Sequence, residues 1–179
     1  MSRLRTAIRA QAGFTLVELL TASTLLLVVL AGLGGMFISS SNAEVNANRF
    51  FQAQTESRVA LERLRRDIRC ATTISPAGPT TSVTLALPAG CTETSGSITW
   101  CTQAAGSVWE LYRVAGASCV GGTRYAGWLT AAQVFTFTAG AGGALGQLTI
   151  DLRIDTEPTK STGRFHITES LVPRNATRT

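Results

Sequence analysis

Few side chains in this sequence have the types and spacing that catalysis needs. The only histidine is His166, which lies in a run of alternating residues and points away from Phe165 and Ile167. No pair of carboxylates, serine–histidine arrangement or cysteine–histidine dyad stands at a spacing typical of an active site. The sequence therefore predicts a non-enzymatic protein without a cofactor.

Four cysteines offer a second kind of chemistry. They are Cys70, Cys91, Cys101 and Cys119, and they stand too far apart along the chain to include a close pair of the kind that binds zinc. We therefore expect no metal site. An even number of cysteines in an exported domain favours disulfides.

A single carboxylate interrupts a long apolar segment near the N-terminus. Between Phe14 and Ile38, Glu18 is the only ionisable side chain. A stretch of about 20 apolar residues spans a bilayer as a helix, and ionisable residues within such a helix are usually functional. We therefore expect a membrane helix in which Glu18 has a role beyond resting at the headgroup level.

Basic residues before this segment predict its orientation. Arg3, Arg5 and Arg9 contribute +3 of the formal charge of +5, and basic flanks stay on the cytoplasmic side. The sequence thus predicts a single-pass protein of the cytoplasmic membrane, with its N-terminus inside and everything after Ile38 outside.

The arginine-rich stretch 58–69 raises the possibility of nucleic-acid binding. Its acidic residues, however, stand four positions from arginines, as Glu62 does from Arg66 and Arg63 from Asp67. This pattern favours the solvated face of a helix and disfavours nucleic acid as a partner.

Periodicity predicts one long helix followed by a β-rich domain. No proline or glycine interrupts Met36 to Ser75, so we expect a helix from about Phe14 to Cys70, about 85 Å long. Its second half is amphipathic, with Leu61, Leu64, Ile68 and Ala71 on one stripe. After a break at 75–79 the period changes to two. The predicted strands are Val83–Leu87, Ser97–Thr102, Val108–Val114, Val134–Thr138, Leu148–Asp155 and Arg164–Leu171.

The run from Gly13 to Leu20, Gly-Phe-Thr-Leu-Val-Glu-Leu-Leu, resembles the prepilin signature of type IV pilins and type II secretion pseudopilins. The resemblance implies an α+β pilin-like fold, in which a long N-terminal helix packs on an antiparallel sheet. It also implies that a prepilin peptidase cuts after Gly13 and methylates the amine of Phe14. Glu18 would then pair with the N-terminal amine of a neighbouring subunit.

Weaker fragments, such as 61–69, 111–113 and 172–175, are similar to minor J-type pseudopilins and W-type minor pilins. The implied partners are other pilin or pseudopilin subunits, the peptidase, an inner-membrane assembly platform and membrane lipid. Two alternatives stay open. One is a filament-tip module that binds DNA or a surface, and the other is a secreted domain released from a signal peptide after Ser41-Asn42-Ala43.

We expect four regions in the chain. They are a leader at 1–13, a transmembrane or filament-core helix at 14–38, the amphipathic half of the same helix at 39–71 and a β-rich domain at 72–179.

A hairpin argument predicts the disulfides. If 97–102 and 108–114 pair around 103–107, opposed residue numbers sum to 210, which places Cys119 opposite Cys91. Cys70 would then bond to Cys101 and fasten the helix end to the sheet. The alternative is a Cys91–Cys101 bond, with Cys70 and Cys119 joined or free.

Overall fold

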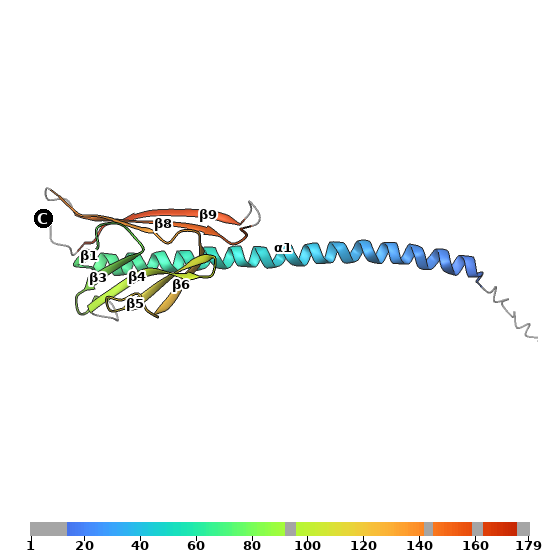
Figure 1. Cartoon of the computed structure of the whole chain (residues 1–179), viewed down its shortest axis with the longest axis horizontal. Coiled ribbons are helices and arrows are strands. Elements are labelled where there is room, and N and C mark those ends of the chain that lie inside the picture. The colour runs from blue at the N-terminus through green and yellow to red at the C-terminus, as the bar shows by residue number, and fades with distance from the viewer. Residues whose placement is uncertain (1–13, 92–95, 142–144, 159–162, 175–179) are drawn as a thin grey trace, which may run out of the picture. The chain divides into compact units, whose positions relative to one another are not determined.

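A computed structural model describes residues 14–91, 96–141, 145–158 and 163–174. It divides between Glu44 and Val45 into two compact units. Helix α1 (Leu16–Cys70) passes through this division without a break (Figure 1). The predicted helix is confirmed, and it begins at Leu16 instead of Phe14.

The second unit contains an antiparallel sheet of nine strands among the described residues. The strand order is β1-β3-β4-β5-β6-β8-β7-β2, and β9 pairs with β8. The strands are β1 (Thr73–Ser75), β2 (Gly78–Thr80), β3 (Ser82–Leu87), β4 (Gly96–Ala105), β5 (Val108–Ala115), β6 (Thr123–Leu129), β7 (Phe135–Thr138), β8 (Gln147–Asp155) and β9 (Arg164–Leu171). Together with α1 they form the predicted α+β, pilin-like fold.

Three strands were not predicted, and each has a local reason. Strands β1 and β2 are very short and flank Pro76, where the sequence indicates only a break. Strand β6 shifts register twice against β5, and Trp128 within it has a φ of 57°. Extra residues of this kind disrupt the alternation by which strands are recognised.

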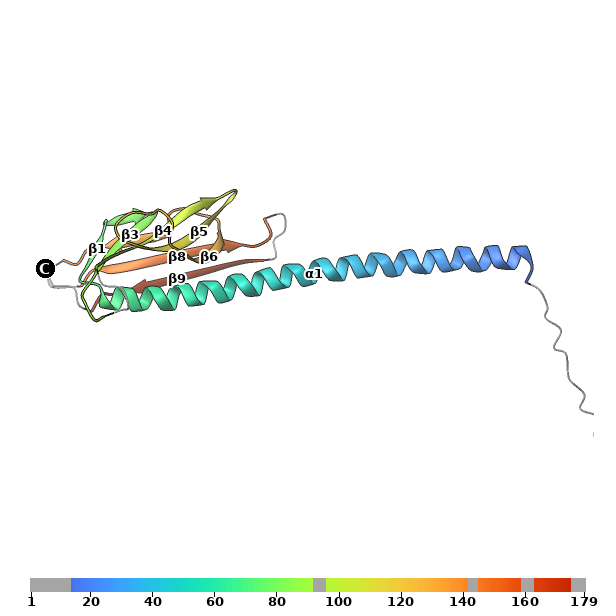
Figure 2. The same ribbon diagram turned by 90° about the horizontal axis from the view of Figure 1, so that it is seen from below.

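The sheet and the C-terminal half of α1 share one apolar core. Leu64, Ile68 and Ala71 are fully buried and Leu61 is 4% exposed, so the predicted stripe is confirmed. Opposite them lie buried side chains from several strands, among them Leu85, Ile98, Trp100, Leu111 and Ile150. Strand β9 lies beside this half of the helix (Figure 2), where the Phe165 ring meets the Phe50 ring edge-on at 5.5 Å.

Strand β8 follows the predicted alternation with one exception. Its apolar residues, Leu148, Ile150, Leu152 and Ile154, are buried. Asp155, which a period of two places on the exposed face, is only 6% exposed, and its carboxylate accepts a hydrogen bond from Arg164 Nε at 2.7 Å. Pairing with an arginine offsets the cost of burying this charge.

A buried carboxylate joins α1 to strands β4 and β5. Asp67 is fully buried, and its Oδ2 accepts hydrogen bonds from Trp100 Nε1 at 2.9 Å and Arg113 Nε at 2.7 Å. The predicted pair of Arg63 with Asp67 is present at 3.7 Å, but it lies under the sheet and not on a solvated face. The predicted pair of Glu62 with Arg66 does not form within the part of the helix described.

The disulfides differ from the prediction. The structure joins Cys70 to Cys91 and Cys101 to Cys119, and not Cys91 to Cys119 or Cys70 to Cys101. The alternative Cys91–Cys101 bond is also absent, since each cysteine is bonded elsewhere. The error lies in the β4–β5 hairpin, where Ala105 pairs with Val108 and opposed numbers sum to 213 instead of 210.

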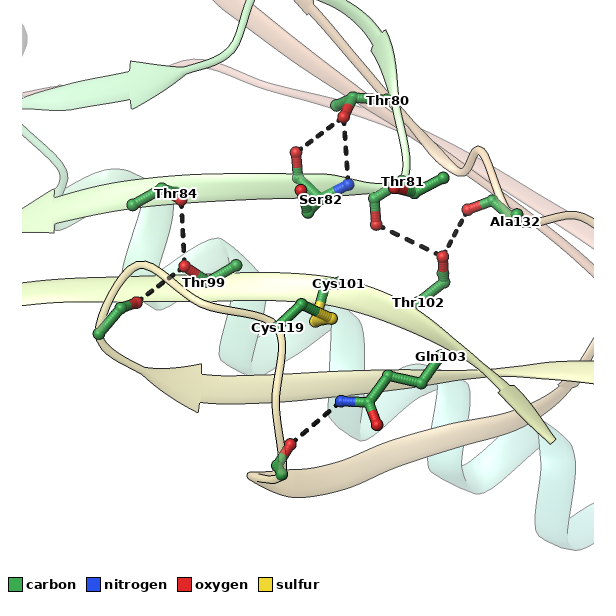
Figure 3. The surroundings of a disulfide bond; sticks show 12 residues. Thr80, Thr81, Ser82, Thr84, Thr99, Cys101, Thr102, Gln103, Cys119 and Ala132 are labelled. Atoms are coloured by element: carbon green, nitrogen blue, oxygen red, sulfur yellow. Dashed lines mark hydrogen bonds between the residues drawn. A yellow bond between two sulfur atoms is a disulfide. The ribbon is translucent and has the colours of Figure 1, made fainter.

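The segment that follows β5 explains how Cys119 reaches Cys101. It turns at Gly116, which has a φ of 95°, and folds back across β4 (Figure 3). Thr99 Oγ1 donates to Gly116 O at 2.8 Å, and Gln103 Nε2 donates to Gly121 O at 3.1 Å. These two hydrogen bonds hold the segment on either side of Cys101. Cys119 therefore does not lie on a continuation of β5, as the predicted hairpin required.

Candidate processing and assembly segment

The start of α1 is shaped by the residues that follow the predicted cleavage site, beginning with Thr15. Thr15 Oγ1 accepts a hydrogen bond from the backbone N–H of Glu18 at 3.2 Å, and Thr15 O accepts one from Leu19 at 3.1 Å. Thr15 is therefore the N-cap, and Glu18 stands at the third helical position, the spacing of a capping box. This cap was not predicted, although the threonine–glutamate spacing was its signal.

Glu18 is exposed and lies in the first turn of the helix. A negative side chain there interacts favourably with the helix macrodipole. Its carboxylate has no ion-pair partner within the described chain, which leaves it available to a positive group from outside. Phe14, which precedes the helix, is 81% exposed. Gly13 lies outside the described residues.

The remaining polar side chains near the start of the apolar segment are satisfied locally. The hydroxyls of Thr21, Ser23 and Thr24 donate to backbone carbonyls three residues earlier, at 3.0, 3.0 and 2.9 Å. Local pairing of this kind lowers the cost of placing a hydroxyl in lipid. Glu18 is therefore the exceptional polar group of this segment.

The apolar residues of the first unit are uncovered. Helix α1 is long and apolar enough to cross a membrane, and none of its most hydrophobic stretch, with a mean hydropathy of 2.2, is buried within the chain. Large apolar side chains left in water are unfavourable. The segment therefore requires lipid or other subunits around it.

Comparison with known families agrees with this arrangement. Residues 8–34 match the family model of the prokaryotic N-terminal methylation motif. The match includes Gly13, Phe14 and Glu18, and it supports a type IV pilin-like substrate of a prepilin peptidase, from a structural and non-enzymatic class of proteins. No curated protein and no solved structure matches the chain.

The lone histidine lies in a polar cluster on the outer side of β8 and β9. His166 contacts the Asp151 carboxylate, and its Nε2 is 2.9 Å from Thr168 Oγ1. The contact with Asp151 could not be foreseen from the position of His166 in the sequence, because it depends on the pairing of β8 with β9. Within the described ranges, no group of three or more His, Cys, Asp and Glu residues is arranged to hold a metal ion.

The arginines in the stretch 58–69 of α1 divide into those that pair with carboxylates of the chain and those that are exposed and unpaired among the described residues. Arg65 Nη2 donates to Glu169 Oε2 at 2.9 Å, and hydrogen bonding to this carboxylate raises the pKa of Arg65. Arg58, Arg66 and Arg69 are exposed and form no ion pair with any described residue. A surface hollow of about 350 Å³ lies beside two of these arginines and is lined by Glu62, Arg65, Arg66 and Arg69.

Proposed function

We propose that this chain is the precursor of a minor pilin or pseudopilin subunit, of the J or W type, for a type IV pilus or type II secretion filament. A prepilin peptidase cuts after Gly13 and methylates the new amine of Phe14. The mature subunit waits in the cytoplasmic membrane, with its second unit outside, and then enters the filament. Other pilin-like subunits and an inner-membrane assembly platform are its partners.

The match at residues 8–34 carries this proposal, because it falls where the apolar helix begins. Cleavage at this position would leave the apolar helix at the new N-terminus. In the proposed function that helix leaves the bilayer and packs among the helices of other subunits. The four regions have matching roles. Residues 1–13 are the leader, 14–38 form the membrane and filament-core helix, 39–71 form its amphipathic half, and 72–179 form the outer domain.

Glu18 supplies the specificity of assembly in this proposal. Removal of the leader creates a positive amine at Phe14, and the free carboxylate of Glu18 in a neighbour is its counterpart. In an apolar surrounding the two charges attract strongly, and leaving either unpaired is costly. The pair therefore favours insertion of a subunit at the register where amine and carboxylate meet.

Mass analysis of the N-terminus tests the processing step. Protein isolated from membranes of cells that contain the peptidase is expected to begin at methylated Phe14 and to continue to Thr179. Cells without the peptidase should retain the leader. A mature chain that begins at Glu44 would contradict the proposal and identify a secretory signal peptide instead.

A further inference from the structure

One face of α1 in the second unit remains uncovered by the sheet. Its residues follow one another at helical intervals of 4, 3, 4, 4 and 3, and all are exposed: Phe51, Thr55, Arg58, Glu62, Arg66 and Arg69. Val59, 50% exposed, borders this row. We call these seven residues the outer helix face. The core side chains of α1, such as Leu61, Leu64 and Ile68, lie on the other side of the helix.

The arginines of this face differ from most other described arginines of the domain, which meet carboxylates within the chain. Off this face the arginines with such partners are Arg63, Arg65, Arg113, Arg124, Arg153 and Arg164, and the exposed Arg49 and Arg174 have none among the described residues. Arg58, Arg66 and Arg69 have no such partner among the described residues. Two of these three border the hollow of about 350 Å³, where Glu62 is the only carboxylate. The lining of the hollow is thus positively charged.

Apolar side chains on the same face indicate the class of partner. Phe51 is 63% exposed and Val59 is 50% exposed. Aromatic residues and arginine are enriched at protein interfaces, where an apolar anchor and charged groups act together. A surface that binds duplex DNA through its phosphates alone does not need an exposed phenylalanine and valine beside its arginines.

We propose that the outer helix face docks a different pilin-like subunit that presents carboxylates to Arg66 and Arg69 and an apolar side chain to Phe51 and Val59. The inference rests on the proposed function. A second copy of this chain is a poorer fit, because its carboxylates are mostly engaged. Those already in ion pairs are Glu56, Asp67, Glu110, Asp151, Asp155 and Glu169.

Charge reversal in the full-length chain tests the docking surface. The double variant Arg66→Glu, Arg69→Glu is expected to enter sheared filaments at least about tenfold less than the wild type, relative to its membrane pool, because charge pairs across interfaces contribute this much or more. The variant Arg66→Lys, Arg69→Lys keeps the charge and should retain most of the incorporation.

Arg49→Glu with Arg174→Glu is the matched control. Both residues are exposed arginines without an ion-pair partner in the described ranges, and neither belongs to the outer helix face. This variant changes net charge equally and should assemble normally. Equal incorporation of the two double reversals, or equal loss in both, would overturn the docking surface while leaving the proposed function intact, provided that the wild type assembles.

Two further outcomes separate the remaining explanations. If wild-type chain is processed but never enters filaments, the proposed function itself fails. If Arg66→Glu, Arg69→Glu assembles normally yet the detergent-solubilised chain loses retention on duplex DNA, the face binds nucleic acid and the inference is wrong. Chymotrypsin resistance of each variant, compared with wild type, reports whether the second unit is folded, because the substitutions remove no chymotrypsin site.

Discussion

At the scale of single residues, two possible roles of Glu18 can be separated by different substitutions. Glu18 stands at the third position of a helix capped by Thr15, and in the proposed function it offers a carboxylate to the amine of a neighbour. Glutamine also serves at the third position of a capping box, but it carries no charge. Alanine keeps the backbone N–H that Thr15 caps, but it has neither a side chain that can complete a capping box nor the charge, so the two variants separate the roles.

We expect Glu18→Gln and Glu18→Ala to be cleaved normally, since in the proposed function the peptidase acts at the Gly13–Phe14 junction. Both should reach filaments at least about tenfold less than wild type, because each leaves the amine without a counterion in an apolar surrounding. Immunoblots of sheared filaments against the membrane pool measure this. Normal assembly of Glu18→Gln with loss only in Glu18→Ala would assign the residue to capping alone.

Asp67 is the residue on which attachment of the helix to the sheet most depends. Asp67→Ala should destabilise the domain of residues 45–179, which holds the whole core, by about 3–5 kcal/mol, because Arg113 and Trp100 Nε1 lose their acceptor while buried. Urea unfolding followed by tryptophan fluorescence measures the loss.

Glu169→Gln provides the comparison for Asp67. It also removes a carboxylate that binds an arginine of α1, but the side chains of Arg65 and Glu169 are 42% and 20% exposed. Water screens such a pair, so the cost should stay below about 1 kcal/mol. Similar losses in the free energy of unfolding for the two variants would show that Asp67 is not the main contact that attaches the helix to the sheet.

At the scale of elements, periodicity correctly predicted the helix stripe and the strand alternation, because each depends only on which residues of one element are buried. The stripe of Leu61, Leu64 and Ile68 and the alternation of β8 follow from burying one face, so both could be read from residue order. Helix α1 could be predicted for a related reason, since an apolar run without proline has few other solutions.

The sequence did not predict features that depend on how two strands pair, because strand pairing leaves no regular pattern of apolar residues in either strand alone. Strand β6 carries extra residues against β5, and the β4–β5 hairpin pairs Ala105 with Val108 where Thr102 was expected. Such a shift changes which residues stand opposite one another, and with them every disulfide inferred from register. The turn at Gly106, with a φ of 67°, was the local signal for the tighter hairpin.

The candidate site divides in the same way. Gly13, Phe14 and Glu18 could be proposed from the sequence because a linear string specifies them, and the Thr15 cap had an equally linear signal in the threonine–glutamate spacing. The Asp67 cluster and the outer helix face required the fold. They depend on which arginines find carboxylates far away in the sequence, as Arg113 of β5 finds Asp67 of α1.

At the scale of the whole molecule, the two units have opposite demands on solvent. The first unit leaves fifteen large apolar side chains exposed between Phe14 and Ile38, and by length and composition α1 can cross a bilayer there. The second unit buries its apolar residues around one core and exposes few large ones. In the proposed function the mature chain satisfies both demands, first in the membrane and then in the filament.

These demands predict how the chain partitions. Full-length protein should remain in the membrane pellet after alkaline carbonate, because the apolar part of α1 from Leu16 to Ile38, about 35 Å long at 1.5 Å per residue, exceeds the hydrocarbon core of about 30 Å. Residues 45–179, exported behind a cleavable signal peptide, should be found in the soluble fraction with both disulfides formed. Full-length Glu18→Ala is the control, since its helix is more apolar and must stay at least as firmly in the pellet. Release of the full-length chain by carbonate would contradict a membrane-spanning segment, and pelleting of residues 45–179 would place a second membrane-binding surface on the outer domain.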